Sequence, residues 1–207
     1  MRRVARAVAF DLLTALLDSW TLWGRVAGDD ELGARWRRGS LELIYASERY
    51  RPYPEIVAEA ARAVDLDPAR ADDLLDRWDE VEPWPEAADV LRDLAGDHRL
   101  AVVTNTSADL AERATARLGV PVDVLVSAEA AGFYKPRPEP YRRALEALDL
   151  APADTVFVAG SAGDVPGAGG VGMPVVWHNR MGAPPAGGEP LAEIPDLRPL
   201  PEIVRSA

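Results

Sequence analysis

Short, uninterrupted apolar runs alternate with amphipathic segments along much of the chain. The runs cover residues 4–10, 99–103, 155–158 and 173–177, with 122–126 as a plausible fifth. Strands that are buried on both faces of a parallel sheet have this continuous apolar character. Apolar side chains spaced by three and four predict helices over residues 85–95, 108–118 and 138–148. The alternation of strands and helices predicts an α/β fold with a doubly wound parallel sheet.

Residues 18–82 interrupt this alternation. Their pattern is helical throughout, with segments at 20–26, 31–45, 53–64 and 68–78, and they contain four of the six tryptophans. Pro83 and Pro85 mark the return to the alternating pattern. We therefore predict a core domain formed by residues 1–17 and 83–207 and an inserted helical cap subdomain formed by residues 18–82. The Gly- and Pro-rich residues 182–190 predict a surface loop.

The composition narrows the function classes. The 207 residues, 48% of them hydrophobic, suit one globular unit with an insertion. The 34 acidic side chains outnumber the 23 basic ones, and the net charge of -11 argues against a general nucleic-acid binder. The absence of cysteine excludes disulfides, thiolate metal sites and a cysteine nucleophile.

No run approaches the roughly 20 apolar residues that a membrane helix needs, so we predict no membrane partner. The first twenty residues superficially resemble a secretory signal, but Asp11 and Asp18 interrupt their apolar run. The expectation is therefore a cytoplasmic protein. One further detail of composition is informative: 22 of the 23 basic side chains are Arg, and the remaining one is Lys135.

Polar residues follow several of the predicted strands. Ligand sites in open parallel sheets lie beyond the carboxyl ends of the strands. Asp11 follows the first apolar run, Thr104 and Asn105 follow the second, and Asp164 comes a few residues after the run at 155–158. Lys135 precedes a predicted helix. If the strands are neighbours, these residues provide a nucleophile or base, an anion-binding pair, and an ammonium between two carboxylates.

These segments resemble, in order and spacing, motifs one to four of the haloacid dehalogenase superfamily. The four segments are residues 10–18, 103–105, 134–136 and 158–164. Residues 36–37, 135–141 and 172–180 are further similar to the 2-haloacid dehalogenase branch. The resemblance implies a Rossmann-like core with a helical cap inserted after the first strand, in agreement with the independent pattern above.

The resemblance to the metal-free branch also implies a mechanism without a cofactor. The carboxylate of Asp11 would attack the α-carbon of a small carboxylic-acid substrate, and water would hydrolyse the resulting aspartyl ester. Lys135 would be the charge partner. Asp164 would orient Lys135 and help to position the water.

The same resemblance assigns residues to substrate binding. Thr104, Asn105 and backbone N–H groups near Leu12 would bind the substrate carboxylate, and Arg37 in the cap would receive the departing anion. Ser161 falls at a family position that helps to orient the carboxylates and the hydrolytic water, and we place it among the substrate-binding residues. Two further candidate contacts are Tyr141, which equally suits packing, and Trp20. For Trp20, as for Trp23 and Tyr45, core packing is the simpler interpretation, although one of these three is expected to touch the substrate. A homodimer is expected from family likeness only.

Two enzymatic alternatives stay open. Phosphatases of the superfamily have carboxylates near Mg²⁺ at positions that are Leu13 and Gly160 here. EDTA would abolish the activity of such a phosphatase. The family's Thr, Ser and Asn fall on Ala15, Ala159 and Ser161, which raises the possibility of another leaving group, such as the ring nitrogen of azetidine-2-carboxylate. A third alternative is a ligand-binding protein without turnover, which would tolerate Asp11→Asn.

Overall fold

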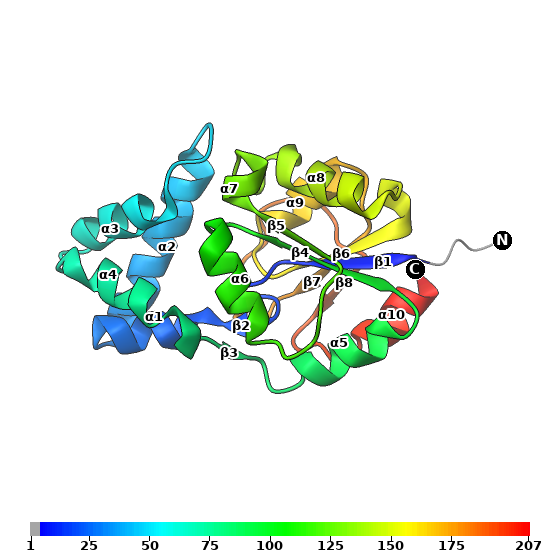
Figure 1. Ribbon diagram of the computed structural model, residues 1–207, viewed down its shortest axis with the longest axis horizontal. Helices are drawn as coiled ribbons and strands as arrows, with labels where there is room; N and C mark the ends of the chain where they lie inside the picture. The colour runs from blue at the N-terminus through cyan, green and yellow to red at the C-terminus, as the bar shows by residue number, and fades with distance from the viewer. Residues whose placement is uncertain (1–4) are drawn as a thin grey trace.

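The computed structural model describes residues 5–207 and is built around a six-stranded, all-parallel sheet (Figure 1). The strand order is β5-β4-β1-β6-β7-β8, so the chain builds outward from β1 first on one side and then on the other. This is the predicted doubly wound α/β architecture. The strands are β1 (Ala7–Phe10), β4 (Arg99–Thr104), β5 (Val124–Ser127), β6 (Thr155–Ala159), β7 (Val175–His178) and β8 (Ala192–Ile194).

Alternate side chains of each central strand pack into two apolar cores, one on each face of the sheet. In β1, Val8 and Phe10 belong to one core, and Ala7 and Ala9 belong to the other. All four side chains are fully buried. Burial on both faces explains why the strand has no polar alternation in its sequence.

Helices cover both faces. Side chains of α5 (Ala87–Ala95), α6 (Ala108–Ala116) and α10 (Leu200–Ser206) contribute to the first core. Side chains of α8 (Pro138–Leu148) and α9 (Asp164–Gly170) contribute to the second. The short helix α7 (Ala128–Ala131) and the 3-10 turn η2 (Pro152–Asp154) complete the layers (Figure 1).

A helical segment leaves and rejoins the core through a short antiparallel pair, β2 (Leu17–Asp18) and β3 (Glu82–Pro83). Four helices and a 3-10 turn lie between these strands, at the left of Figure 1: α1 (Ser19–Ala27), α2 (Asp30–Ala46), α3 (Tyr53–Ala63), α4 (Ala69–Asp76) and η1 (Trp78–Glu80). The carboxylates of Asp18 and Asp29 accept N–H groups at the starts of α1 and α2. The division into a core and a cap at residues 18 and 82 stays a prediction.

The structure corrects several element boundaries. The first strand begins at Ala7 rather than at residue 4, which lies outside the described residues. The hydrophobic pattern of the sequence does not predict β8 or the helices α7, α9 and α10. The α9 segment contains three glycines and a proline, which have poor helix propensity. The predicted loop at 182–190 is confirmed as exposed, irregular chain.

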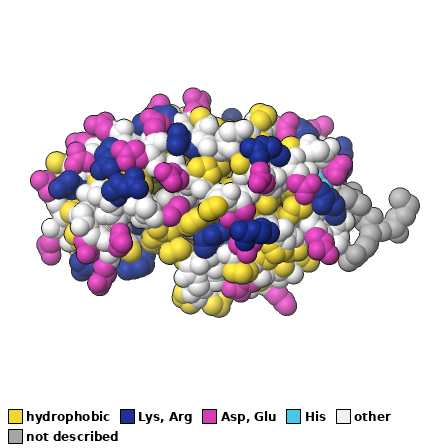
Figure 2. Space-filling model, turned by 90° about the horizontal axis from the view of Figure 1, so that it is seen from below, with side chains coloured by type: hydrophobic (Ala, Val, Ile, Leu, Met, Phe, Trp, Pro, Cys, Tyr) yellow, Lys and Arg dark blue, Asp and Glu magenta, His cyan; other side chains and the backbone are white. Residues whose placement is uncertain are grey.

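Acidic and basic side chains are interspersed over the face shown in Figure 2. Many charged side chains of the described residues form ion pairs at the protein surface, such as Arg77 with Glu80 and Arg113 with Asp79. Among residues 5–207, no helix combines the length and apolar character needed to cross a bilayer. The homodimer stays a prediction.

Candidate active site

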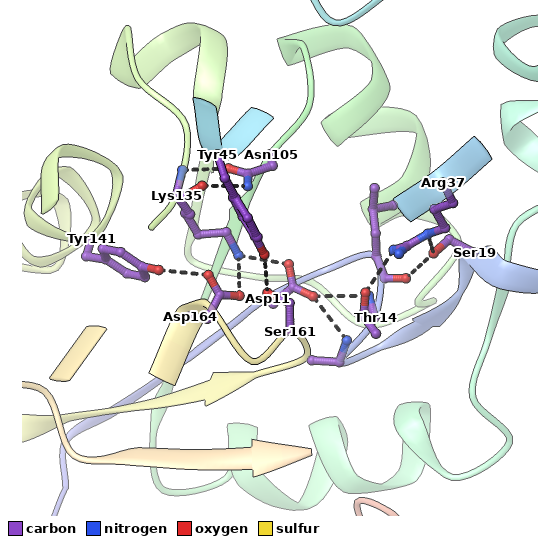
Figure 3. Close-up of polar contacts among 12 residues, drawn as sticks. Asp11, Thr14, Ser19, Arg37, Tyr45, Asn105, Lys135, Tyr141, Ser161 and Asp164 are labelled. Carbon is purple, nitrogen blue, oxygen red and sulfur yellow. Dashed lines mark hydrogen bonds and ion pairs between the residues drawn. The ribbon is translucent and has the colours of Figure 1, made fainter. Parts of the chain in front are cut away.

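The polar residues that follow the strands meet around one ammonium group (Figure 3). Lys135, from the loop before α8, places Nζ 2.8 Å from Oδ1 of Asp11 and 3.0 Å from Oδ2 of Asp164. Asp11 directly follows β1, and Asp164 begins α9 after β6, which is the hydrogen-bonded neighbour of β1. The adjacency of β1 and β6 therefore brings together carboxylates that are 153 positions apart in sequence.

These three groups are buried, and burial together with their mutual charges shifts the pKa of each. Burial alone would raise the pKa of Asp11, but the Lys135 ammonium and the N–H groups of Ala15 and Thr14 lower it overall. Burial acts to lower the pKa of Lys135, but the two carboxylates raise it overall. Burial raises the pKa of Asp164, and the nearby Asp11 charge adds to this effect. Asp11 is thus the carboxylate that stays ionised more readily, and Asp164 is the stronger base.

The two oxygens of Asp11 have different surroundings. Oδ2 accepts the backbone N–H groups of Thr14 at 3.1 Å and Ala15 at 3.2 Å. A Cβ atom on Gly160 would lie 2.5 Å from the same oxygen and 2.3 Å from the nitrogen of Ala15. Oδ2 is therefore enclosed between the loop and Gly160, whereas Oδ1 is the oxygen bonded by Lys135. Any side chain at position 160 would collide with the Asp11 loop in this backbone arrangement.

The donor set does not fit a magnesium ion. Lys135 Nζ lies between the two carboxylates that would have to coordinate the cation. Position 160 has no room for an additional carboxylate. Within residues 5–207, no group of three or more His, Cys, Asp or Glu side chains could hold a metal ion.

Thr104 and Asn105, at the end of β4, lie beside the same site. Asn105 donates through Nδ2 to the Lys135 carbonyl and accepts the Lys135 N–H, at 3.0 and 2.7 Å. Its amide therefore fixes the backbone of the Lys135 loop. The Thr104 hydroxyl is buried and has no hydrogen-bond partner in the described structure. A buried hydroxyl without a partner is costly, which marks it as a group available to a ligand.

Arg37 reaches the site from α2. Its Nε donates to the Ser19 hydroxyl at 3.1 Å and one terminal nitrogen donates to the Thr14 hydroxyl at 2.9 Å. The other terminal nitrogen is buried without a partner in the described structure. Trp20 stacks on the guanidinium at 4.0 Å. Burial lowers the pKa of Arg37, but an arginine remains charged at neutral pH.

A cavity of about 30 Å³ lies between these groups and the cap helices. By volume it holds roughly two or three water molecules, which suits a compact ligand. Its polar lining includes Asp11, Arg37, Thr104, Asn105, Lys135 and Ser161. Its apolar wall is formed by Leu13, Trp23, Leu41, Ile44 and Tyr53.

Three of the predicted substrate contacts lie outside this lining. The side chain of Leu12 is buried in the core, but the prediction for this residue concerns the backbone N–H groups near it and stays a prediction. Trp20 contacts Arg37 rather than the cavity. Tyr141 donates its hydroxyl to Oδ1 of Asp164 at 2.7 Å, from the side of that carboxylate that faces away from Asp11 (Figure 3). Asp11 and Asp164 are called the acid pair below. In contrast, Ser161 lines the cavity and accepts a hydrogen bond from Tyr45 of α2 at 3.3 Å.

Sequence reasoning missed several residues of the site. Thr14 and Ser19 anchor Arg37, and Gly160 allows the close approach of the β6 loop to Asp11. Of these, Gly160 had a readable signal, because a glycine in motif four indicates a tight backbone contact. The apolar wall from α1, α2 and α3 has no signal of its own, because these positions have the same apolar spacing as ordinary helix packing.

The model of one protein family, the haloacid dehalogenase-like hydrolases, matches residues 5–172. The chain is 30% identical to (S)-2-haloacid dehalogenase 4A of Burkholderia cepacia over 199 residues, which cover 87% of this chain and 85% of that one. It is 36% identical to a phosphoglycolate phosphatase of Cupriavidus necator over 115 residues, covering 53% and 50% of the two chains. A crystal structure of a dehalogenase superposes with a TM-score of 0.88 at 26% identity and covers all of both chains.

Proposed function

We propose that this chain, which belongs to the haloacid dehalogenase-like hydrolase family, cleaves a bond α to a carboxylate without a metal ion. The bond is carbon–halogen or a related carbon–heteroatom bond, and the reaction passes through an aspartyl ester. The observation that carries the proposal is the Asp11–Lys135–Asp164 cluster, in which an ammonium holds two carboxylates of different basicity beside a small cavity.

In the first step, Oδ1 of Asp11 attacks the α-carbon of the substrate. The new bond joins Oδ1 to that carbon, and the leaving group departs with the electron pair of the broken bond. Thr104, with its free hydroxyl, and the N–H groups near Leu12 bind the substrate carboxylate. The unpartnered nitrogen of Arg37 provides a charged N–H donor for the departing anion.

In the second step, water attacks the carbonyl carbon of the ester. Asp164, whose pKa is raised mainly by burial, accepts a proton from this water and also keeps Lys135 in place. The bond between the Asp11 carbonyl carbon and Oδ1 then breaks, and the proton that Asp164 took from the water passes to Oδ1, which becomes the product hydroxyl. The product leaves as a 2-hydroxy acid that has taken its new oxygen from Asp11.

The phosphatase alternative is less compatible with the structure. It requires an acid at position 160, where no side chain fits in this backbone arrangement. It also lacks a leaving-group acid, because that position is Leu13. One relative that is a phosphatase matches about half of this chain.

A single turnover in H₂¹⁸O, with enzyme in excess over a 2-haloacid, tests the proposal. We expect one ¹⁸O atom in the peptide that contains Asp11 and none in the first equivalent of product, because water attacks the ester carbonyl. Peptide mass analysis measures both. Label that enters the product directly, with none in the enzyme, contradicts the ester route.

The same assay separates the alternatives. Azetidine-2-carboxylate in place of the haloacid reports on ring opening, which labels Asp11 in the same way but releases no halide. EDTA leaves the labelling unchanged under the proposal. Turnover of small phosphoesters that EDTA abolishes, without label from any haloacid, identifies a phosphatase instead.

Replacing Tyr141 with phenylalanine is expected to move the acid limb of kcat to higher pH. The Tyr141 hydroxyl donates to Asp164, and this hydrogen bond lowers the pKa of that carboxyl. Its removal raises the pKa further, so Asp164 becomes protonated, and inactive as a base, earlier as the pH falls. Above the limb, we expect kcat within about threefold of wild type, which corresponds to the loss of one hydrogen bond.

Tyr134→Phe provides a matched control for this pH profile. The Tyr134 hydroxyl donates to the Arg51 carbonyl at 2.7 Å and does not contact the acid pair. Its removal should leave the acid limb where it is in the wild type. Coincident profiles for Tyr141→Phe and the wild type would mean that the titration of Asp164 does not limit the reaction.

A further inference from the structure

The indole of Trp84 forms a hydrogen bond to the backbone loop whose N–H groups bind the Asp11 carboxylate. Trp84 donates Nε1–H to the Thr14 carbonyl at 2.9 Å. This carbonyl and the N–H of Ala15 belong to one peptide group, and that N–H bonds Oδ2 of Asp11. The peptide thus lies between the indole donor and the carboxylate acceptor. A donor on the carbonyl polarises the peptide and strengthens its N–H as a donor.

The next peptide of the loop is held in the same way. His178, at the end of β7, bonds the Ala15 carbonyl through Nδ1 at 2.8 Å. Because a carbonyl only accepts, Nδ1 carries the proton. Nε2 of the neutral ring then accepts the Nε–H of Arg180 at 3.4 Å. Burial lowers the pKa of His178, which favours this neutral form.

Trp84 has little freedom to turn away from the loop. Its backbone N–H donates to the Leu16 carbonyl at 2.9 Å. The Arg180 guanidinium stacks on its ring at 4.4 Å and pairs with the buried Glu86. Glu86 also accepts the N–H of Leu197 at 3.1 Å. A chain of contacts from α5 to the residues after β8 therefore fixes the indole under the Asp11 loop.

We propose that Trp84 is a positioning residue that prepares the Ala15 N–H, which lies beside the Thr14 N–H, as the donor of an oxyanion hole for ester hydrolysis. The inference rests on the proposed function. After Oδ1 has formed the ester, Oδ2 is its carbonyl oxygen and still faces both N–H groups. When water adds to the carbonyl carbon, the π electron pair moves onto Oδ2. The pair returns as the bond to Oδ1 breaks.

The two hydrogen bonds to Oδ2 act differently in the two steps. In the first step, Oδ2 loses negative charge as the ester forms, so stronger N–H donors give no acceleration. In the second step, Oδ2 gains a full charge, and donors fixed at that position stabilise it. Trp84 should therefore support the hydrolysis of the ester and not its formation.

Trp84→Phe removes the indole N–H while it retains an aromatic ring beneath Arg180. We expect kcat to fall roughly tenfold, which is less than the 10²–10³ of losing a direct oxyanion donor. We expect kcat/KM, which reports the steps up to ester formation, to stay within about twofold of wild type, so that KM falls with kcat. The alkylated enzyme should accumulate, visible as one equivalent of halide in a burst and as the ester mass of the intact protein.

Trp78→Phe is the matched control. The Trp78 indole donates to the Leu110 carbonyl at 3.0 Å, away from the Asp11 loop, so its removal should cause no burst and no accumulation of ester. If Trp84→Phe does not fold, 3-benzothienylalanine at position 84 keeps the shape of tryptophan and replaces only the N–H.

The outcomes are distinct for the two proposals. A wild-type enzyme that forms ester, together with a Trp84 variant that hydrolyses it at the wild-type rate, overturns the role of Trp84 alone. A parallel loss of kcat and kcat/KM without ester accumulation also overturns it, because general disruption of the site explains that result. A wild-type enzyme that forms no ester overturns the proposed function and this inference together.

Discussion

Asp11→Asn is expected to reduce turnover of a 2-haloacid by at least roughly 10⁴-fold, the size of effect seen when a nucleophilic unit is removed. The neutral amide oxygen is a poor nucleophile, so no aspartyl ester forms. In the single-turnover experiment, neither halide release nor ¹⁸O at position 11 should appear. Halide release under enzyme excess and the mass of the peptide that contains residue 11 measure both effects.

The fold should survive this substitution with a moderate loss of stability. Lys135 keeps Asp164 as its partner at 3.0 Å, so the buried ammonium is not left without a carboxylate. The asparagine has one oxygen, which can satisfy either the N–H groups of Thr14 and Ala15 or Lys135, but not both. We expect the free energy of unfolding to fall by about 1–3 kcal/mol.

A matched control is Asp154→Asn, a buried carboxylate before β6 that lies outside the cavity lining. Its turnover should stay within about threefold of wild type, provided the variant is folded. If Asp11→Asn leaves turnover unchanged, Asp11 is not the nucleophile. A third result is that neither the wild type nor Asp11→Asn turns over any candidate substrate, while Asp11→Asn still replaces the wild type in the cell. In that case the chain acts as a ligand-binding protein.

Much of the fold was predictable because the decisive pattern is local. The continuous apolar runs marked β4, β5, β6 and β7, and the α8 segment was predicted with its observed bounds. The elements that were missed depend on tertiary contacts. In α9, glycines and a proline form a helix whose first side chain, Asp164, is held by Lys135 and Tyr141. Local propensity does not contain those partners.

The meeting of Asp11, Lys135 and Asp164 could be anticipated because the carboxyl ends of neighbouring parallel strands share one edge of the sheet. The residues that hold the Asp11 loop in place could not be predicted in this way. Trp84 and His178 donate hydrogen bonds to backbone carbonyls. Because every residue has such a carbonyl, the sequence does not indicate which one is the partner. Asn105 was predicted to bind the substrate carboxylate, but in the structure its side-chain amide holds the Lys135 backbone.

Lys135→Arg is expected to lower kcat by roughly 10²–10³-fold, the range for losing a preorganised charged donor at a reacting group. The only lysine of the chain is deeply buried, with 1% of its side chain exposed. Its Nζ lies between two carboxylates and 5.4 Å from the Phe157 ring. A planar guanidinium is broader than an ammonium and must displace Asp11 or Asp164 to fit between them. Steady-state kinetics with a 2-haloacid measures the loss.

Arg137→Lys is the control for this exchange, because it makes the reverse change two residues away in the same loop. Arg137 donates to the Ser47 carbonyl and does not contact the acid pair, so we expect turnover within about threefold of wild type. The circular dichroism of Lys135→Arg should match that of the wild type, since the positive charge between the carboxylates is kept. A folded Lys135→Arg enzyme with wild-type kcat would show that a compact ammonium is not required, and would contradict the assignment of Lys135 as the charge partner of Asp11.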